Sequence, residues 1–597
     1  MAKFPGFIGP AYEARAGSAD LQRLVNLFLE KNESGNDEDV WTMYSTPGTT
    51  AFCTLPTSPF RGIWYGENRL FVVSGAAFYE VFSNGTYTNR GTIANDGNPA
   101  YIFPNGNQVM VVSGGQVYID DGTTLQQPYY TSAQGYVNVT GGVNVQCYYG
   151  DTFDATMVGN YILIAGVAYE VATLVDAYHL TLTTSAPNGS SLAYSIPNSG
   201  RVLVGGYAVV LISGDDFVPA MVGHTITISG TAYTVATWVN SREILLTTPF
   251  SGSYGPLPIF PYWASIPVTA SCGAVLDGFF IVATPYSKQV NISQAWNGLR
   301  WDPAHYQIKE GYPDNILFLY ADHEELYVGG AQSIEVWRNT GNGDFPFQRD
   351  ASGFNHRGIG ALFSYCRLGQ GIALLSSDSK GGPVAIMLQG YTPARVSTHA
   401  LEYRWGKYTT WTDAESWSYI EEGHEFWVIQ FPTAGETWVY DAANGTWHQR
   451  AYGLSLTRWK GRNHAAAFGS HVVGDIATGA LYKMSAEYPT DGGTTIRRIR
   501  RAPHIRTSTD VTGRGAHAHF KVLMEYTSGD TVTLTWSNDY GDHWYGPLNP
   551  DGFLIADGTA GRVLGYRWTR LGSFYDRVYE LEVRSSDKVA IFEVDVA

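Results

Sequence analysis

The residues Asn68 to Gly75 read NRLFVVSG, and 39 residues later the chain repeats this pattern as NQVMVVSG from Asn107 to Gly114. Each copy is a short run of β-forming residues that stops at a glycine turn. A period of about 40 residues is typical of β-propellers, because four short strands and their turns form one blade whose faces neighbouring blades cover. Weaker copies follow at residues 278–283, 325–337 and 426–440. The sequence therefore predicts an all-β fold with a β-propeller body.

A second repeat has a longer period and a different pattern. The residues from Gly150 to Thr184 match those from Gly214 to Thr248, 64 residues later, without a gap. Glycines separate short alternating apolar runs in both copies, which is typical of hairpins. We interpret residues 136–262 as a tandem of small β modules inserted into the propeller, since an insertion at a surface loop leaves the parent fold intact.

The two repeats divide the chain into five predicted regions. These are an N-terminal arm (1–50), first propeller blades (51–135), the tandem inserted modules (136–262), remaining blades (263–490) and a C-terminal β region (491–597), either a β-sandwich or a closing blade. One helix is predicted within the arm, because Leu21, Leu24, Val25 and Phe28 have helical spacing behind the capping residues Ser18 and Asp20.

Composition limits the classes of function. The formal net charge of -16 argues against a surface that wraps DNA, which needs basic side chains to displace the counterions of the phosphates. It is compatible with a wall past which DNA slides. The cysteines Cys53, Cys147, Cys272 and Cys366 are isolated in the sequence, so no metal site and no dense disulfide framework is predicted. We also expect no cofactor, no secretion signal and no membrane anchor, since no apolar run approaches the ~20 residues of a membrane span.

One motif resembles the Asp-box turn of sialidases and related propellers, and it lies at Ser537 to Trp544 (SNDYGDHW). We predict a structural turn in which Asp539 accepts backbone hydrogen bonds, Gly541 takes a positive φ and Trp544 packs beneath. The many Trp and Tyr residues can stack on sugars, so the alternative function is a carbohydrate-binding or glycan-cleaving propeller. No nucleophile elbow, phosphate-cradling loop or zinc-protease motif is present, so we predict no catalytic residues and no enzyme activity. His323 and His424, each beside glutamates, are expected in surface turns.

The only dense basic stretch runs from Ile496 to Arg506. It contains five arginines, of which Arg497, Arg498, Arg500 and Arg501 are the candidate residues. They permit two interpretations: contact with phosphates, or a strand whose arginines pair with carboxylates across a subunit or blade boundary. In so acidic a chain we favour the second.

A series of motifs runs in order along the chain outside the insert. They are Gln22 to Leu27, Tyr44 to Gly48, Trp301 to Pro303, Tyr312 to Asp314, Glu325 to Gly341, Phe345 to Phe347, Arg357 with Gly358, Gly390 to Thr398, Glu402, Val439 to Asp441, Trp447, Val473 to Asp475, Arg500 to His504 and Arg570 to Gly572. This ordered set resembles the podovirus family of packaged-DNA stabilisation proteins, which form the tail hub or nozzle of short-tailed bacteriophages. Arg395, Glu335 and Trp337 belong to these motifs and join the arginine run as candidate subunit-contact or structural residues.

The resemblance implies a structural protein of the phage tail, assembled in the host cytoplasm. Members of the family form a hexameric β-propeller tube below the portal and adaptor rings, which retains packaged DNA and conducts it during ejection. The implied partners are further copies of the chain in a ring, the portal-adaptor ring, a tail fibre or tailspike, needle or plug proteins, and passing double-stranded DNA bound without sequence specificity. The resemblance also implies an extended segment where the helix is predicted. The insert departs from the family pattern, and we expect it on the outside of the tube, in contact with tail fibres or a neighbouring subunit.

Overall fold

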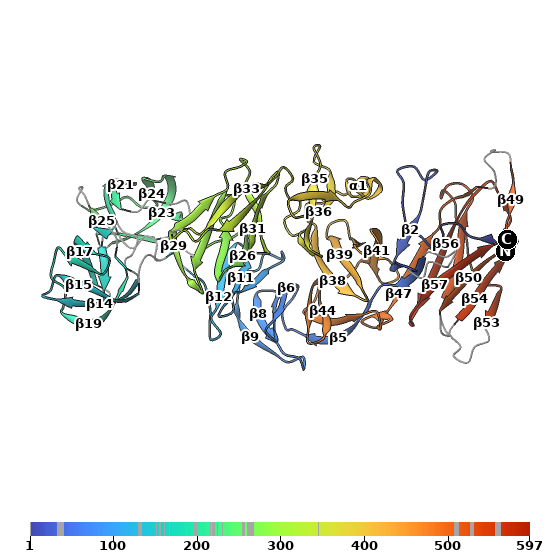
Figure 1. Ribbon diagram of the computed structural model, residues 1–597, viewed down its shortest axis with the longest axis horizontal. Coiled ribbons are helices and arrows are strands. Elements are labelled where there is room, and N and C mark those ends of the chain that lie inside the picture. Colours follow the sequence, from blue (N-terminus) through green and yellow to red (C-terminus); the bar gives the residue numbers. More distant parts are fainter. Residues whose placement is uncertain are drawn as a thin grey trace. The chain divides into compact units, whose positions relative to one another are not determined.

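The computed structural model is built almost entirely of strands (Figure 1). It describes residues 2–32, 41–128, 130, 134–150, 152–153, 157–159, 161–165, 167–195, 200–214, 217, 221–223, 225–229, 231–252, 257–259, 268–343, 345–506, 513–525, 531–555 and 563–597. Within these residues there is one α-helix, α1 (His399–Trp405). The chain divides into two compact units: the first comprises Met1–Ile102, Gly329–Glu335 and Ala351–Ala597, and the second comprises Phe103–Val328 and Val336–Asp350.

The predicted blades are four-stranded antiparallel sheets. Five stand alone. Their strands are β6 (Phe60–Gly66), β7 (Arg69–Ser74), β8 (Ala77–Val81) and β9 (Tyr87–Thr92); β10 (Tyr101–Pro104), β11 (Val109–Ser113), β12 (Gln116–Asp120) and β13 (Leu125–Gln126); β26 (Cys272–Leu276), β27 (Phe279–Ala283), β28 (Gln289–Gln294) and β29 (Asn297–Ile308); β30 (Ile316–Asp322), β31 (Glu325–Gly330), β32 (Ile334–Asn339) and β33 (Phe347–Asn355); and β34 (Cys366–Leu368), β35 (Gly371–Ser377), β36 (Pro383–Gln389) and β37 (Thr392–Arg395).

Two further groups of four lie within a larger sheet of 16 strands. The first is β38 (Glu415–Glu421), β39 (His424–Phe431), β40 (Glu436–Asp441) and β41 (Thr446–Tyr452). The second is β43 (Gly461–Ala467), β44 (Ser470–Asp475), β45 (Ala480–Ser485) and β5 (Gly48–Thr54). In this last group a strand from near the N-terminus completes a sheet whose other three strands lie more than 400 residues later, so the two distant parts of the chain must fold together.

The 39-residue repeat is confirmed in the strand register. In the first copy Val72 pairs with Tyr79 and Ser74 with Ala77, and in the second Val111 pairs with Tyr118 and Ser113 with Gln116. The turn needs glycine: Gly75 has φ +53°, and a Cβ there would lie 2.8 Å from the carbonyl oxygen of Ser58.

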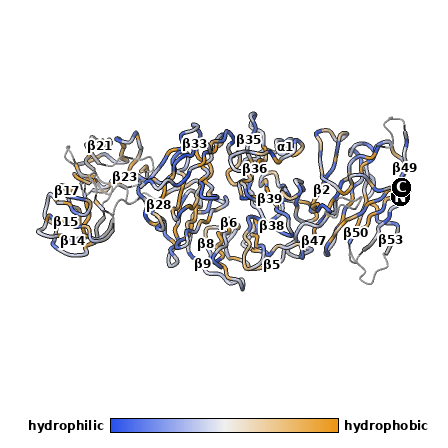
Figure 2. The backbone as a smooth tube through the Cα atoms, viewed as in Figure 1, coloured by the Kyte–Doolittle hydropathy of each residue, from blue (hydrophilic) through white to orange (hydrophobic). Residues whose placement is uncertain are grey.

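The faces of successive sheets in the first unit are buried against one another. Leu375 and Ala373 pack with Trp427 and Ile429 between two sheets, and Val72 packs with Leu481 between two others. Figure 2 shows the hydrophobic residues following strands such as β38, β39 and β50. This face-to-face burial is the reason a single blade cannot stand alone.

The insert forms two closed six-stranded barrels with the same strand order. The first comprises β14 (Gln134–Thr140), β15 (Asn144–Gly150), β16 (Tyr161–Ile164), β17 (Val167–Asp176), β18 (His179–Leu182) and β19 (Gly189–Ser195); the second comprises β20 (Gly200–Gly205), β21 (Ala208–Gly214), β22 (Thr225–Ile228), β23 (Thr231–Asn240), β24 (Glu243–Leu246) and β25 (Leu257–Ile259). Each repeated module is therefore longer than the matching residues that reveal it. Of the repeat positions, Asp151, Gly166, Asp215, Asp216 and Gly230 lie outside the described residues.

The C-terminal region is a β-sandwich that includes the N-terminal arm. One sheet contains β1 (Ala2–Lys3), β3 (Leu27–Lys31), β4 (Trp41–Ser45), β50 (His519–Glu525), β53 (Gly552–Ile555), β54 (Val563–Thr569) and β57 (Ala590–Val596). The strands opposite are β2 (Arg23–Val25), β47 (Thr494–Arg501), β51 (Thr531–Ser537), β52 (Tyr545–Leu548) and β56 (Asp576–Ser585). Buried Phe7, Leu29, Phe520, Trp568 and Leu581 belong to the core between them.

The predicted helix from Leu21 to Phe28 is wrong. The segment forms β2 and β3, which are separated by Asn26 at φ +55°. β2 pairs with β47 and β3 with β4, and the buried Asn26 amide donates to the carbonyls of Ala451 (3.0 Å) and Arg497 (2.8 Å). Pairing with distant strands therefore overrides a local pattern of apolar residues that fits a helix.

Candidate functional site

The arginine run forms strand β47 in the interior of the first unit. β47 lies between β2 and β56, so its side chains alternate between the sandwich interior and the opposite face. Arg498 and Arg500 are both fully buried, whereas Arg497 and Arg501 lie on the other face. One strand thus separates the four arginines into two pairs with different environments.

The two buried arginines donate hydrogen bonds to backbone and side-chain oxygens of their own chain. Arg498 donates to the carbonyls of Ile496 and Ser585, both at 3.1 Å, and to the Ser45 hydroxyl at 2.7 Å. Arg500 donates to Phe7 O at 2.5 Å, Gly6 O at 2.9 Å and Gln22 Oε1 at 2.8 Å. Burial lowers the pKa of Arg500 to about 9. Both guanidinium groups are enclosed by their own chain, an environment that fits the structural alternative for Arg498 and Arg500.

The other two arginines pair with carboxylates on the neighbouring strand. Arg497 Nη2 lies 2.6 Å from Glu582 Oε2, and Arg501 Nε lies 2.8 Å from Glu580 Oε2. The guanidinium of Arg501 also lies over the Trp544 ring, 4.6 Å from its centre. Arg497 and Arg501 therefore pair with carboxylates of their own chain.

The segment Ser537 to Trp544 forms a self-contained turn. Asp539 Oδ1 accepts from the backbone N–H of His543 (2.9 Å) and from the Ser537 hydroxyl (2.8 Å). Gly541 has φ +91°, and the Trp544 indole N–H donates to the Gly541 carbonyl at 3.0 Å. The hydrogen bonds that the carboxylate accepts from the His543 backbone N–H, the Ser537 hydroxyl and the His543 ring lower the pKa of Asp539 to about 2. The aspartate is thus engaged in holding the turn.

The remaining predicted residues lie apart from the arginine strand. Arg395 makes two hydrogen bonds of 2.6 Å to Glu402 on α1, next to the helix cap Thr398. Glu335 and Trp337 are buried along β32, and Trp337 meets the ring of Phe345 edge-on at 6.1 Å. The structure therefore does not gather the predicted residues into one site.

A charged cluster that the sequence did not reveal lies in the first unit, at the beginning of strands β38 and β43. Arg462 holds Glu415 through Nε–Oε2 (2.7 Å) and Nη2–Oε1 (2.5 Å), and it also donates to Phe60 O (3.0 Å). Arg458 donates to Glu415 Oε2 (3.3 Å) and to Gln430 Oε1 (2.9 Å). The group lines a cavity of about 560 Å³. No spacing signal predicts it, because Glu415, Arg458 and Arg462 come from three strands, β38, β42 (Thr457–Arg458) and β43.

Two histidines lie buried in the same unit. His424, expected at the surface, is only 6% exposed, and its Nδ1 lies 2.8 Å from Asp441 Oδ2; its expected surface position is wrong because it begins the central strand β39. His448 is 2% exposed and burial lowers its pKa to about 3. His323, in contrast, is exposed in a turn, as predicted.

The described residues contain no group of three or more His, Cys, Asp or Glu side chains placed to hold a metal ion. They also contain no helix of the length and apolar character needed to cross a membrane.

Residues 269–488 match the family model described as bacteriophage P22 Gp10, β-propeller. Among solved structures, the chain is similar to Kluyveromyces lactis Hsv2 (10% identity, TM-score 0.22, covering 67% of this chain and 97% of that one). It is also similar to KlHsv2 with loop 6CD replaced by a Gly-Ser linker (7% identity, TM-score 0.21, covering 67% and 97%). A comparison with curated proteins finds no match.

Proposed function

Since residues 269–488 place the chain in the bacteriophage family of packaged-DNA stabilisation proteins, as a virion component with a β-propeller, we propose that it is the nozzle of a short tail. Six copies close a ring below the portal-adaptor, retain the packaged DNA and conduct it during ejection. The family match is the observation that carries this proposal.

The charge of the chain supports a conducting wall. A formal net charge of -16 makes the average surface repel the phosphates of DNA, so that a duplex in the lumen slides without being held. The densest basic run adds no unpaired arginine for phosphate binding, because Arg498 and Arg500 are buried and the other three pair with Glu582, Glu580 and Asp576.

The architecture supports a mechanical role. Both ends of the chain are held in one sandwich by β1–β57 pairing and by the buried arginines of β47, so the first unit is tied at its termini. A subunit fixed in this way suits the repeated head-to-tail contacts from which a cyclic ring is built. The two inserted barrels have their own closed sheets and suit an outward position that meets tail fibres or a neighbouring subunit. No covalent chemistry is assigned to the chain.

The alternative is a sugar-handling propeller, for which exposed tyrosines such as Tyr148, Tyr286 and Tyr575 are the main rings available for stacking among the described residues. Its motivating turn is occupied by its own hydrogen bonds. Of the described tryptophans only Trp296 is exposed, and six others are fully buried in the cores. Stacking platforms for sugars need exposed rings.

Native mass spectrometry and negative-stain imaging of the full chain, alone and with the cognate portal-adaptor ring, test the proposal. We expect a six-fold tube, formed alone or on the adaptor, and no binding of a short DNA duplex at low salt. A second sample, with residues 136–262 replaced by a Gly-Ser linker, should form the same tube without its outward projections. A stable monomer that ignores the adaptor and binds or cleaves glycans would refute the nozzle.

A further inference from the structure

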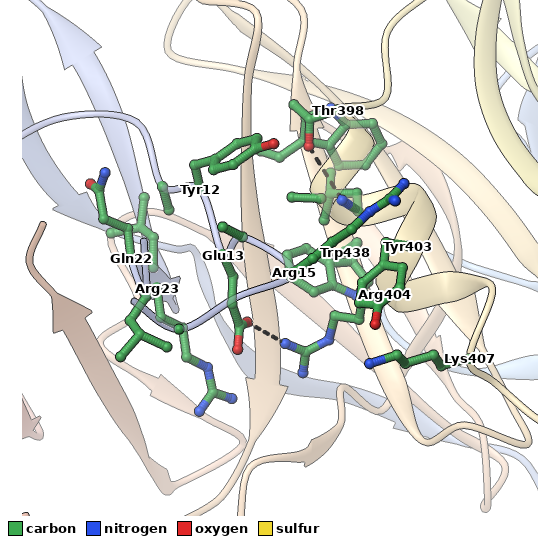
Figure 3. A pocket seen from close by; sticks show the side chains of 18 residues that line it. Tyr12, Glu13, Arg15, Gln22, Arg23, Thr398, Tyr403, Arg404, Lys407 and Trp438 are labelled. Atoms are coloured by element: carbon green, nitrogen blue, oxygen red, sulfur yellow. Dashed lines mark hydrogen bonds and ion pairs between the residues drawn. The ribbon is translucent and has the colours of Figure 1, made fainter. Parts of the chain in front are cut away.

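A cavity of about 310 Å³ opens between the N-terminal segment 11–24 and helix α1, both in the first unit (Figure 3). One wall is the loop closed by the pairing of Glu13 with Leu21. The other consists of α1 and the rings of Trp438 and Trp447. A volume of about 300 Å³ is at the lower end of ligand-binding sites in proteins, and admits a few side chains of a peptide.

Four cationic side chains line this cavity: Arg15, Arg23, Arg404 and Lys407. Only Arg404 is neutralised directly, by Glu436 (Nη2–Oε1 2.8 Å) and Glu13 (Nη1–Oε2 2.5 Å). Among the described residues, the other three make no ion pair with a carboxylate. The cavity therefore carries an excess of positive charge inside a chain whose net charge is -16.

The three unpaired cations are held in position by neutral groups. The guanidinium of Arg15 and the ammonium of Lys407 lie 4.9 Å and 4.1 Å from the centre of the Tyr403 ring, and Figure 3 shows both reaching toward it. Arg23 Nη2 and Nε donate to Gln449 Oε1 at 2.8 Å and 3.2 Å.

The environment of Arg23 disfavours its positive charge. Burial lowers its pKa most, and the positive charges of Arg404 and Arg501 lower it further, while the negative charges of Glu580 and Glu13 act in the opposite direction. A partly buried guanidinium beside two others is stabilised by an anion that enters the cavity, and its planar fork suits a carboxylate.

Apolar groups complete the lining. Leu21, Leu24 and Leu401 contribute aliphatic surface, and the two indoles contribute flat rings. Duplex DNA, about 20 Å wide, cannot enter a cavity of this size, and free phosphate would leave the apolar walls unused. Acidic and apolar side chains on one extended segment match both features. We propose that this cavity binds an acidic peptide segment of a partner protein, with its carboxylates facing Arg23, Arg15 and Lys407 and an apolar side chain against Leu401 and Trp438. All residues that line the cavity belong to one chain, so peptide binding does not require six copies to form a ring.

Fluorescence anisotropy of an end-capped peptide, Gly-Glu-Leu-Asp-Phe-Glu-Gly, carrying an uncharged dye, tests this on the full chain. We expect saturable binding that weakens about tenfold or more in the double variant Arg15→Gln/Lys407→Gln. Binding should also weaken as NaCl rises from about 50 to about 300 mM, since salt screens exposed charges. The variant Lys380→Gln/Lys588→Gln removes the same charge from exposed positions elsewhere and should bind as the parent does.

Competition distinguishes the ligand classes. The same peptide with Gln and Asn in place of Glu and Asp should compete at least about tenfold more weakly, and inorganic phosphate and a short DNA duplex should not displace the probe. Equal affinity of the double variant, equal affinity of the neutral peptide, displacement by duplex or phosphate at lower concentration than by the acidic peptide, or no saturable binding up to about 1 mM peptide would each overturn the proposal.

Discussion

Replacing Arg500 by methionine should loosen the N-terminal segment from the sandwich. Arg500 makes three hydrogen bonds, to Phe7 O, Gly6 O and Gln22 Oε1, and it is fully buried. Each hydrogen bond from a charged donor contributes about 1.5–3 kcal/mol. Of the three acceptor residues, Phe7 is buried, Gln22 is half-buried and Gly6 is exposed. Methionine has similar length and no charge, so it fills most of the space.

The loss is partly offset, because Arg500 has a cost of its own. Its Nη1 is buried without an acceptor, and no carboxylate forms an ion pair with it among the described residues. Removing a buried charge recovers several kcal/mol of desolvation. We therefore expect a net destabilisation of about 2–4 kcal/mol, which corresponds to faster local opening by about 30- to 1000-fold.

Hydrogen exchange followed by mass spectrometry measures this opening in peptides covering residues 2–24, with peptides from β38 to β41 as an internal reference. Arg584→Met is the matched control: Arg584 is 41% exposed and, among the described residues, forms an ion pair only with Glu582 on its own strand, so it should change exchange by less than about 1 kcal/mol. If residues 2–24 exchange within about threefold of the parent protein in Arg500→Met, the guanidinium does not anchor the N-terminus and the reasoning fails.

Three further predictions concern other charged groups. Glu415→Gln should destabilise β38 and β43 by about 3–5 kcal/mol in hydrogen exchange, because it leaves Arg462 buried without its carboxylate, whereas the double change Glu415→Met/Arg462→Met should recover most of the loss. Burial lowers the pKa of His448 to about 3, so the imidazole stays neutral in the folded protein and its effect on the free energy of unfolding is constant above pH about 6.5. Below that pH the free energy of unfolding should fall by about 1.4 kcal/mol per pH unit. The difference in β41 hydrogen exchange between the parent and His448→Gln should follow this slope from pH 6 to 4, and a pH-independent difference would contradict it. The depressed pKa of Asp539 means that its turn is stabilised above pH about 4 and loses this stabilisation as the pH falls toward 2; Asp539→Ala should open the Ser537–Trp544 turn to limited proteolysis at neutral pH, and unchanged cleavage would show that the carboxylate does not hold it.

Several features of the fold could be predicted because they depend on local patterns. The 39-residue repeat predicted hairpins of equal register, since a short apolar run ending in a left-handed glycine leaves few alternatives. The 64-residue repeat predicted two like modules, and the structure adds that each closes into a barrel. The Asp539 turn depends on residues within eight positions of one another, so its hydrogen bonds could be drawn from the sequence.

Other features depend on residues that are far apart in the chain. The Leu21 to Phe28 segment has a helical pattern, yet it is a pair of strands because β47 and β4 offer hydrogen-bonding edges that the isolated segment lacks. Arg498 and Arg500 look like a surface patch in the sequence, but β47 buries both, with Ser45 and Ser585 in contact with Arg498 and residues 6–7 in contact with Arg500. The cationic cavity joins residues 11–24 to residues 398–447, and no local signal relates the two segments.

The sequence by itself determined the all-β class, the repeating blades and modules, the acidic balance and the family resemblance. These follow from composition, periodicity and ordered motifs, which are properties of neighbouring residues. Only the tertiary structure decided that the termini share one sandwich, which arginines are enclosed, and where unpaired cations meet aromatic rings. Strand pairing and burial bring together residues hundreds of positions apart, and those contacts set the charge environment of each group.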